Sequence, residues 1–389
     1  MTIPVYLDNQ ATTRVDSRVI DAMIPLMDDV YGNPASIQHE FGWRAEAAVE
    51  EARARVGALV GARPGEIVFT SGATESINMA LKGAARGSGR RGGRIITAVT
   101  EHRAALDTCA RLEEEGFEVV RLTVDGMGMV NPGDVRSALT PGTILVSIMA
   151  ANNEIGTVAP LAAIGALCRE RGVIFHTDAT QAAGKIPVDM DAMGIDMLSF
   201  SAHKMHGPKG VGALAIAERR PRLRVAPILD GGGHEKGLRP GTLNVPAIAG
   251  FGLAAEIARA SMEEEAGRVG RLRDMLVQGI AGAVDGARLN GHPTARIPQN
   301  ANICFPGVRA EAVMMGMKDI AVSTGSACSS ASPAPSHVLL ALGLSTEETL
   351  GSIRFGLSRF TTEEEIGYTI RRVAETVRLV AAREAQFHS

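Results

Sequence analysis

A lysine at the end of a predicted buried strand is the residue in this chain best suited to chemistry. The apolar run Met197–Ser201 predicts the strand, and Ala202-His203-Lys204 leads from it to a Gly-Pro-Lys-Gly turn. Burial would take the Lys204 amine out of water, lower its pKa and free its lone pair for nucleophilic attack. Such a lysine can form a Schiff base with a carbonyl cofactor, whereas a lone lysine before a turn is more often exposed to solvent.

A carboxylate at the end of a second strand suggests which carbonyl cofactor this is. Residues 172–179 read GVIFHTDA, an apolar run that ends near Asp178, with Gln181 shortly after it. An aspartate at the end of a buried strand needs a positive partner, and the protonated pyridine nitrogen of pyridoxal phosphate (PLP) would be one. Asp178 lies 26 residues before Lys204, so the two could lie at neighbouring strand ends. The alternative is an aspartate that caps the next helix.

A third segment has the pattern of an anion site. The strand-like run Glu66–Thr70 leads through residues 71–74 (SGAT) into a helical pattern. Small residues and free amide groups at the start of a helix bind anions such as phosphate. Many turns between a strand and a helix share this pattern, so alone it is weak evidence for a phosphate site. Its position in the chain before Asp178 and Lys204 makes that evidence stronger.

Cys328 is a candidate for a second reactive group. It lies in STGSACSSAS, residues 323–332, where small polar side chains predict an exposed loop. A free thiol in such a loop would oxidise unless the loop covers it or its reactivity has a use, and a reactive thiolate needs a nearby base or positive charge. Cys109, Cys168 and Cys304 instead lie in apolar helix or strand patterns and are expected to be buried.

His102 and Arg354 are two further candidates, each with a structural alternative. His102 follows a strand and opens a helix, where it could stack on a cofactor ring and move protons near neutral pH. It could equally be a helix-start histidine without a catalytic role. Arg354 lies inside an otherwise apolar strand and so suggests a carboxylate partner, which could belong to a substrate or to an internal Asp or Glu.

An alternation of strands and helices positions these groups. The sequence predicts strands at 66–70, 94–100, 118–124, 143–149, 173–178, 197–201 and 211–216, with helices such as 103–115 and 161–171 between them. This order predicts an α/β fold, with a mostly parallel sheet flanked by helices, in which ligands bind at the carboxyl ends of the strands. Ser71, Asp178 and Lys204 all lie at such ends.

A second, smaller α+β domain is predicted after a glycine-rich loop at 230–234. A long helical region at 245–284 precedes strand patterns at 300–305, 320–323 and 352–357 and helices at 335–342 and 362–386. The N-terminal segment is expected to complete this domain. We therefore expect a large cofactor-binding domain over residues 15–260 and a small domain formed by residues 1–14 and 261–389, which carries the Cys328 loop.

Composition excludes several other classes of protein. The 389 residues are 45% hydrophobic, enough for a large core, and a net charge of −3 gives no sign of a nucleic-acid surface. No apolar run reaches the roughly 18 residues of a membrane helix, and the N-terminus lacks the features of a signal peptide. The four cysteines have no zinc-site or disulfide spacing, so we expect a reducing, cytoplasmic location and no metal.

The motifs together resemble a known family. Through nearly its whole length the chain is similar to the cysteine desulfurases of the NifS/IscS type, which are PLP enzymes of fold type I. The matching segments, in chain order, are YLD (6–8), ATT (11–13), GNP (32–34), FTSGATES (69–76), TEH (100–102), NNEIG (152–156), HTDATQ (176–181), SAHK (201–204), GGGHEKG (231–237), GSACSSAS (325–332) and the strand around Arg354.

This resemblance implies a role for each matching residue. Lys204 would hold the PLP carbonyl, Asp178 would pair with the pyridine nitrogen and Gln181 with the phenolic oxygen, and His102 would stack on the ring. The phosphate would be bound by Thr74, Ser201, His203 and, in a homodimer, the partner subunit's Thr242. Asn153 would lie near the cofactor and, with Arg354, would hold the substrate carboxylate. Cys328 would accept the sulfur.

The implied reaction converts L-cysteine to L-alanine and transfers the sulfur to Cys328 as a persulfide. The sulfur would then serve iron–sulfur cluster or other sulfur-compound assembly, through an acceptor or scaffold protein. A selenocysteine lyase or a related PLP enzyme of the aminotransferase type is the alternative, and a PLP-free scaffold is a third reading. Aminotransferases of this fold need no thiol in a loop, so Cys328 favours the desulfurase.

Overall fold

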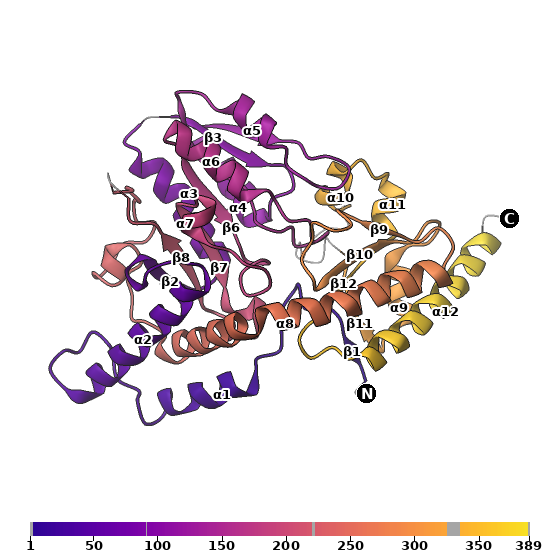
Figure 1. The fold of residues 1–389 in the computed structure, drawn as a ribbon, viewed down its shortest axis with the longest axis horizontal. Helices are drawn as coiled ribbons and strands as arrows, with labels where there is room; N and C mark the ends of the chain where they lie inside the picture. Colours follow the sequence, from indigo (N-terminus) through magenta and orange to yellow (C-terminus); the bar gives the residue numbers. More distant parts are fainter. Residues whose placement is uncertain (1–2, 91, 220–221, 325–334, 388–389) are drawn as a thin grey trace.

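The protein is built around a seven-stranded sheet with the strand order β2-β8-β7-β6-β5-β3-β4 (Figure 1). The computed structural model describes residues 3–90, 92–219, 222–324 and 335–387. β8 runs antiparallel to β2 and β7, and all other neighbours in this sheet are parallel. The mostly parallel sheet predicted from the sequence is therefore confirmed. Its strands are β2 (Ile67–Thr70), β3 (Arg94–Ala98), β4 (Glu118–Leu122), β5 (Thr143–Ser147), β6 (Ile174–Asp178), β7 (Met197–Ser201) and β8 (Gly212–Ile216).

Alternate side chains of these strands face two different layers of helices. Ile95 of β3 packs in a cluster with α3 (Ala73–Gly87) and α4 (Arg103–Glu114). Its neighbour Ile96 packs with α2 (Glu40–Leu59), α6 (Leu161–Arg171) and the first part of α8 (Val245–Ala283). Side chains of a strand alternate between its faces, and both faces of the inner strands are covered, which explains why these strands are mostly apolar. The other helices of this half are α1 (Ser17–Met23), α5 (Pro132–Ala138) and α7 (Met190–Met193).

A second hydrophobic core forms around a three-stranded antiparallel sheet with the order β12-β10-β9. A parallel pair of short strands, β1 and β11, contributes Val5 and Ile320 to the same core. Three helices, α9, α12 and the last part of α8, pack on it. The elements are β1 (Val5–Tyr6), β9 (Arg288–Asn290), β10 (Asn300–Cys304), α9 (Ala310–Gly316), β11 (Ile320–Ala321), α10 (His337–Ala341), α11 (Thr346–Leu350), β12 (Ser352–Gly356) and α12 (Glu363–Phe387).

One long helix, α8 (Val245–Ala283), joins the two cores. Its residues up to Met262 pack with the first core, and those from Val269 onward pack with the second. Figure 1 shows α8 running past the large sheet and on to β12. We propose the division into residues 15–260 and residues 1–14 with 261–389 because of these two cores, with the boundary inside a continuous helix.

The N-terminal segment also crosses between the two cores. The main-chain N–H groups of Val5 and Leu7 donate to the carbonyl groups of Asp319 and Ala321 over 2.9 and 2.8 Å, so the segment begins beside β11. A few residues later, the Thr13 N–H donates to the His203 carbonyl over 3.0 Å, in the turn after β7. The segment therefore runs from the second core to the edge of the large sheet.

The described cysteines lie in the hydrophobic interior, as predicted. Cys109, Cys168 and Cys304 are buried, and burial raises the pKa of the Cys109 and Cys168 thiols to about 12. Cys328 lies outside the described residues. None of the helices in the described part of the chain is long and apolar enough to cross a membrane.

Candidate active site

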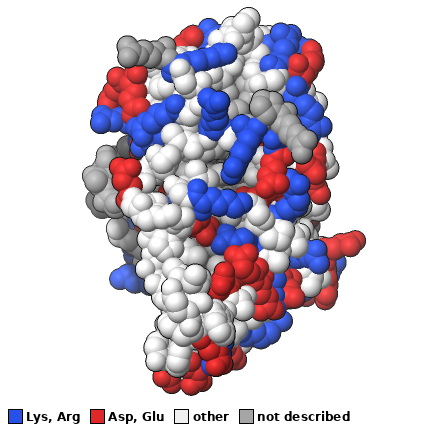
Figure 2. All heavy atoms as spheres, turned by 90° about the vertical axis from the view of Figure 1, so that its left-hand side faces the viewer, with Lys and Arg blue, Asp and Glu red and all other residues white. Residues whose placement is uncertain are grey.

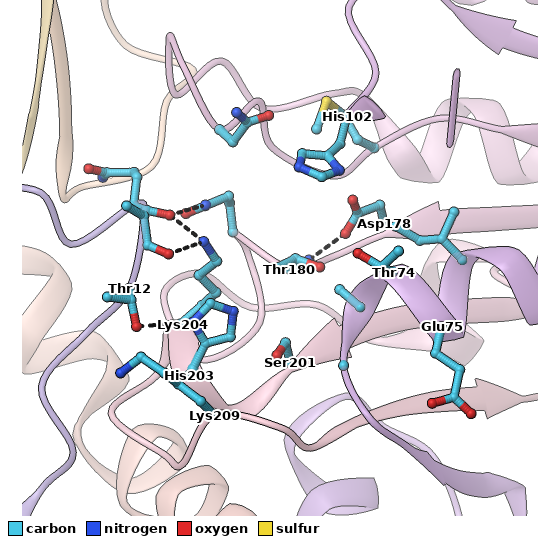
Figure 3. A pocket seen from close by; sticks show the side chains of 18 of the residues that line it. Thr12, Thr74, Glu75, His102, Asp178, Thr180, Ser201, His203, Lys204 and Lys209 are labelled. Carbon is cyan, nitrogen blue, oxygen red and sulfur yellow. Dashed lines mark hydrogen bonds between the residues drawn. The ribbon is translucent and has the colours of Figure 1, made fainter. Parts of the chain in front are cut away.

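A cavity of about 510 Å³ opens at the carboxyl ends of β6 and β7, beside the start of α3 (Figure 3). This is the edge of the sheet at which the sequence predicted a ligand site. The residues predicted from the sequence that line it are Thr74, His102, Asn153, Asp178, Gln181, Ser201, His203, Lys204 and Arg354. Thr242 does not line this cavity and is exposed, and Cys328 lies outside the described residues.

Lys204 and Asp178 reach the cavity from adjacent parallel strands. β7 ends at Ser201, and one 3-10 turn (η3, Ala202–Lys204) brings the Lys204 side chain to the strand edge. Asp178 is the last residue of β6 and is only 4% exposed. Its Oδ1 accepts a hydrogen bond from the Thr180 N–H at 2.9 Å. Asp178 thus stabilises the following turn and lines the cavity as well, so the capping alternative does not exclude the cofactor role.

The N-terminal segment forms one wall of the cavity, which the sequence reasoning did not anticipate. The Lys204 Nζ donates to the carbonyl oxygens of Gln10 and Ala11 at 2.5 and 2.7 Å. The Gln181 Nε2 also donates to the Gln10 carbonyl, at 3.1 Å. These contacts use main-chain oxygens, which carry no signal in a sequence. The sequence analysis identified this segment only by the motif ATT (11–13) and assigned no role to it.

Gly356 of β12 shows how closely this wall packs. A Cβ atom at this position would lie 1.8 Å from the Gln10 Oε1 and 2.8 Å from the Asn9 main-chain nitrogen. The Asn9 Nδ2 donates to the Gly356 carbonyl at 2.7 Å, so the two backbones lie side by side. Only glycine fits here, because any side chain would push the wall, and with it the carbonyl groups that contact Lys204, out of place.

The turn before α3 has the geometry of an anion site. Gly72 is the N-cap of α3, has a φ of +154° and offers no side chain to cap the helix. It also lies so close to β8 that a Cβ atom on Gly212 would come within 2.7 Å of the Gly72 Cα. The first-turn N–H groups of a helix have no partners within the helix and attract anions. Ala73 and Thr74, at that first turn, line the cavity.

His203 and Lys209 bring nitrogen atoms to the same side of the cavity. Burial, and then the charges of Lys204 and Lys209, lower the pKa of His203 to about 4. Its neutral ring forms a hydrogen bond of 3.1 Å between Nδ1 and the Thr12 hydroxyl group. Lys209 follows in the Gly-Pro-Lys-Gly turn, lines the cavity and was not predicted as a site residue. The sequence presented it only as part of a turn.

Arg354 has the internal carboxylate partner that the sequence left open. It is 1% exposed, and its Nη2 donates to Asp8 Oδ1 at 3.0 Å and to the Ser323 hydroxyl at 2.7 Å. Its Nη1 donates to the Asn153 carbonyl at 3.1 Å. The Nε is buried and has no hydrogen-bond partner among the described residues. Because Arg354 also lines the cavity, an internal partner does not exclude a substrate carboxylate.

His102 begins a helix, as the structural alternative predicted, and it also lines the cavity. It is the N-cap of α4, and its Nδ1 accepts a hydrogen bond of 3.1 Å from the Ala104 N–H. The capping bond fixes the ring at the start of the helix. The same ring lines the cavity (Figure 3). The structural role as a cap is therefore compatible with a position in the cavity wall, and the stacking and proton-transfer role stays a prediction.

A fully buried histidine supports the strands beneath the cavity. His176 of β6 is 0% exposed, and burial lowers its pKa to about 3. Its Nδ1 lies 2.8 Å from the Ser147 hydroxyl, and its Nε2 lies 3.0 Å from the Ser199 hydroxyl. A neutral imidazole has one donor and one acceptor, which matches a hydroxyl group on each side.

The buried His176 predicts a specific loss of stability in mild acid. The folded state keeps the ring neutral, whereas the unfolded chain takes up a proton below about pH 6.5, so stability is lost as the pH falls from that value toward the folded pKa of about 3. At pH 5 the loss from this group is about 2 kcal/mol. We expect His176→Gln, whose amide can still bond both hydroxyl groups, to lose less stability between pH 7 and pH 5 than the unaltered protein. Urea unfolding at both pH values measures this, and an equal loss in both proteins would contradict it.

Comparison with known proteins gives consistent matches to one group. The family described as Aminotransferase class-V matches residues 5–368. A relative described as cysteine desulfurase IscS, from Anaeromyxobacter dehalogenans (strain 2CP-C), is 54% identical over 378 residues, which cover 97% of this chain and 93% of the relative. A solved NifS-like protein has a TM-score of 0.90 at 39% identity, with coverage of 96% of this chain and 99% of that one. The solved structure of SspA in complex with cysteine has a TM-score of 0.81 at 36% identity, with coverage of 92% and 100%.

Proposed function

The chain belongs to the aminotransferase class-V family, and we propose that within it the chain acts as a PLP-dependent cysteine desulfurase of the NifS/IscS type. The observation that carries the proposal is one cavity lined by Lys204, Asp178 and the start of α3. Each of these three features fits a different part of PLP. The relative at 54% identity has the name cysteine desulfurase, and the solved relative SspA binds cysteine.

The described residues pass a simple test of fit for PLP. The start of α3, without a capping side chain at Gly72, suits a phosphate group. The buried carboxylate of Asp178 suits a cationic ring nitrogen, which would give it the positive partner that a buried charge needs. Lys204 would hold the carbonyl carbon, and Gln181, Ser201 and His203 line the cavity around it. When bound, PLP supplies an electron sink that stabilises negative charge on the α-carbon of an amino acid.

In this proposal Lys204 moves the α-proton of the substrate. Its amine, once released from the carbonyl carbon, can take that proton and return it at a different position. The carbonyl groups of Gln10 and Ala11, at 2.5 and 2.7 Å from Nζ, can hold the resulting ammonium group. They accept hydrogen bonds only, so they favour the protonated amine during this step.

In this proposal Arg354 and Asn153 bind the carboxylate of L-cysteine. The guanidinium group of Arg354 lines the cavity, and its plane is fixed by Asp8, Ser323 and the Asn153 carbonyl. A fixed guanidinium group binds a carboxylate with defined geometry as well as charge. A bound carboxylate would orient the substrate between Arg354 and Lys204.

We propose that Cys328 then accepts the sulfur. Its thiolate attacks the sulfur of the substrate, a sulfur–sulfur bond forms, and the carbon–sulfur bond breaks with its electrons left on the substrate carbon. Protonation of that carbon gives L-alanine, and the enzyme carries a persulfide on Cys328. The step needs no external oxidant, because the substrate carbon gains the electrons that the sulfur atoms lose. We propose that the persulfide supplies iron–sulfur cluster assembly or another sulfur compound in the cytoplasm.

Changing Cys328 to alanine tests this proposal. We expect the variant to keep the visible absorbance of bound PLP but to form neither L-alanine nor a persulfide from L-cysteine, because the sulfur has no acceptor. Cys168→Ala is the matched control, since Cys168 is buried and its pKa is raised to about 12 by that burial. Alanine assays and intact-protein mass spectrometry provide the measurements. Continued alanine formation by the Cys328 variant would reject the sulfur transfer, and a preference for selenocysteine would favour the lyase alternative.

We also propose that the enzyme is a homodimer in which Thr242 reaches the phosphate site of the partner. Thr242 is exposed and does not line the cavity of its own chain. A face formed by α1 and the start of α2 exposes many large apolar side chains, as expected of an interface rather than of a free surface. Figure 2 shows a broad area without charged residues over this part of the molecule. The side chains are Ile20, Ile24, Met27, Tyr31, Ile37, Phe41 and Trp43.

A further inference from the structure

The ion pair between Glu75 and Arg239 lies beside the start of α3, and the function proposed above gives it no role. Glu75, in the first turn of α3, lines the cavity, and its Oε1 accepts a hydrogen bond of 2.9 Å from the Arg239 Nε. Its Oε2 accepts a hydrogen bond of 2.7 Å from the Ser71 N–H, which opens the turn into the helix. Glu75 therefore fixes the turn proposed as the phosphate site, and at the same time brings a negative charge to it.

The charge on Glu75 is largely removed from solvent. The side chain of Glu75 is 12% exposed, and that of Arg239 is 24% exposed. Burial, the largest influence, raises the pKa of Glu75, but hydrogen bonds from Arg239 and Ser71 outweigh it, and the pKa is lowered overall. The carboxylate is therefore ionised at neutral pH. Charges in such a site are screened less than in water, so an unpaired Glu75 would repel a phosphate group nearby.

We propose that Arg239 is a positioning residue for the cofactor phosphate, which it serves by neutralising Glu75 while Glu75 holds the Ser71 turn. The inference extends the proposed function and depends on phosphate binding at the start of α3. Arg239 itself does not line the cavity, so it acts through Glu75 rather than by contact with the cofactor. Figure 3 shows the Glu75 side chain pointing away from Lys204 and Asp178.

The segment that carries Arg239 has a second contact with the large sheet, close to the turn before α3. Glu235 accepts a hydrogen bond of 2.7 Å from the Phe69 N–H in β2, two residues before Ser71. Its carboxylate pairs with Arg53 of α2 at 2.7 Å, and these two side chains are only 2% and 11% exposed. Residues 235–239 are therefore held against β2 and α3 of their own chain at both ends. Thr242, three residues later, takes its position from this anchored segment.

Cofactor titration of three apoprotein variants tests the inference. Arg239→Gln leaves Glu75 charged and unpaired, and we expect its dissociation constant for PLP to rise by about 10-fold, the effect of one uncompensated charge at several ångströms in a partly buried site. Adding Glu75→Gln to this variant should restore binding to within about 3-fold of the unaltered protein, because the double variant has no unpaired charge. Binding is followed by the visible absorbance of the bound cofactor.

Two controls separate a charge effect from a general loss of structure. Pyridoxal, which lacks the phosphate group, should bind the unaltered protein and the Arg239 variant equally well. Arg86→Gln breaks an ion pair with Glu115 at the other end of α3, with N···O at 2.7 Å in the intact pair, and should leave PLP binding unchanged. Thermal unfolding of each apoprotein checks that it is folded.

Each result has a distinct meaning. Unaltered apoprotein that fails to bind PLP would overturn the proposed function itself. If the unaltered protein binds PLP and Arg239→Gln binds it equally well, only the present inference is overturned. The inference is also overturned if the Arg239 variant loses affinity for PLP and pyridoxal alike, if the double variant is not restored, or if Arg86→Gln has the same effect as Arg239→Gln.

Discussion

Lys204→Ala is expected to lower the turnover of L-cysteine by at least about 1,000-fold, because the variant lacks the group that we propose holds the cofactor carbonyl and moves the α-proton. The amine at this position contacts the Gln10 and Ala11 carbonyl groups in a wall formed by main chain. No other described lysine has that position, although Lys209 lines the same cavity. Alanine formation measured under saturating L-cysteine gives the size of the loss.

Reduction with borohydride followed by peptide mass spectrometry tests the same assignment without an activity assay. The unaltered protein should carry the mass of the reduced cofactor on the peptide that contains Lys204, and Lys204→Ala should carry it nowhere. Lys209→Ala is the matched control, since it removes another lysine that lines the same cavity, and its label should remain on Lys204. A label on any other side chain of the unaltered protein would refute the assignment.

Arg354→Lys is expected to lower kcat/KM for L-cysteine by about 100-fold, mainly through KM, because an ammonium group cannot reproduce two charge-assisted hydrogen bonds from one plane. Lysine is the informative replacement. Arg354 is buried against Asp8, with an N···O distance of 3.0 Å, and removing its charge would leave that carboxylate without its partner. Loss of one member of a buried pair costs about 3–5 kcal/mol of stability. The lysine variant keeps the charge and should stay folded.

Cysteamine, which is L-cysteine without the carboxylate, separates binding of the carboxylate from every other effect of this variant. With cysteamine the unaltered protein and Arg354→Lys should form the visible complex with the cofactor at similar concentrations. With L-cysteine the variant should need a concentration higher by about 100-fold. A variant that is equally impaired with both compounds would show that Arg354 supports the cavity and does not bind the carboxylate.

The large sheet could be predicted closely because most of its strands are buried on both faces and are rich in apolar residues, although the edge strand β4 exposes Glu118 and Arg121. Met197–Ser201 and the helix Leu161–Arg171 lie where the sequence placed them, and most other strands differ by one or two residues at their ends. The run predicted over 94–100 ends as a strand at Ala98, because the chain turns there toward His102. The short strands β1 and β9 gave no such run and were not predicted.

The site was predictable where its chemistry depends on side chains, and not where it depends on main chain. Lys204, Asp178 and the turn at Gly72 could be predicted to line one cavity because they occur together at strand ends of one sheet, although each alone is a common pattern. The Gln10 and Ala11 carbonyl groups could not, since every residue has a carbonyl. The sequence predicted that Arg354 has a carboxylate partner but could not identify Asp8, because the two residues are 346 positions apart in the sequence.

The path of the N-terminal segment sets the order in which the enzyme can be completed during its synthesis. Residues 5–13 are made before the other described elements, yet the strand that aligns them is β11, and the Gly356 N–H that bonds the Leu7 carbonyl at 2.6 Å is made much later in the chain. The large sheet can form long before that. A nascent chain that stops short of Gly356 would therefore contain Lys204 and Asp178 but not the finished wall beside them, so we expect vitamin B6 to be captured in its final geometry only after Gly356 has emerged.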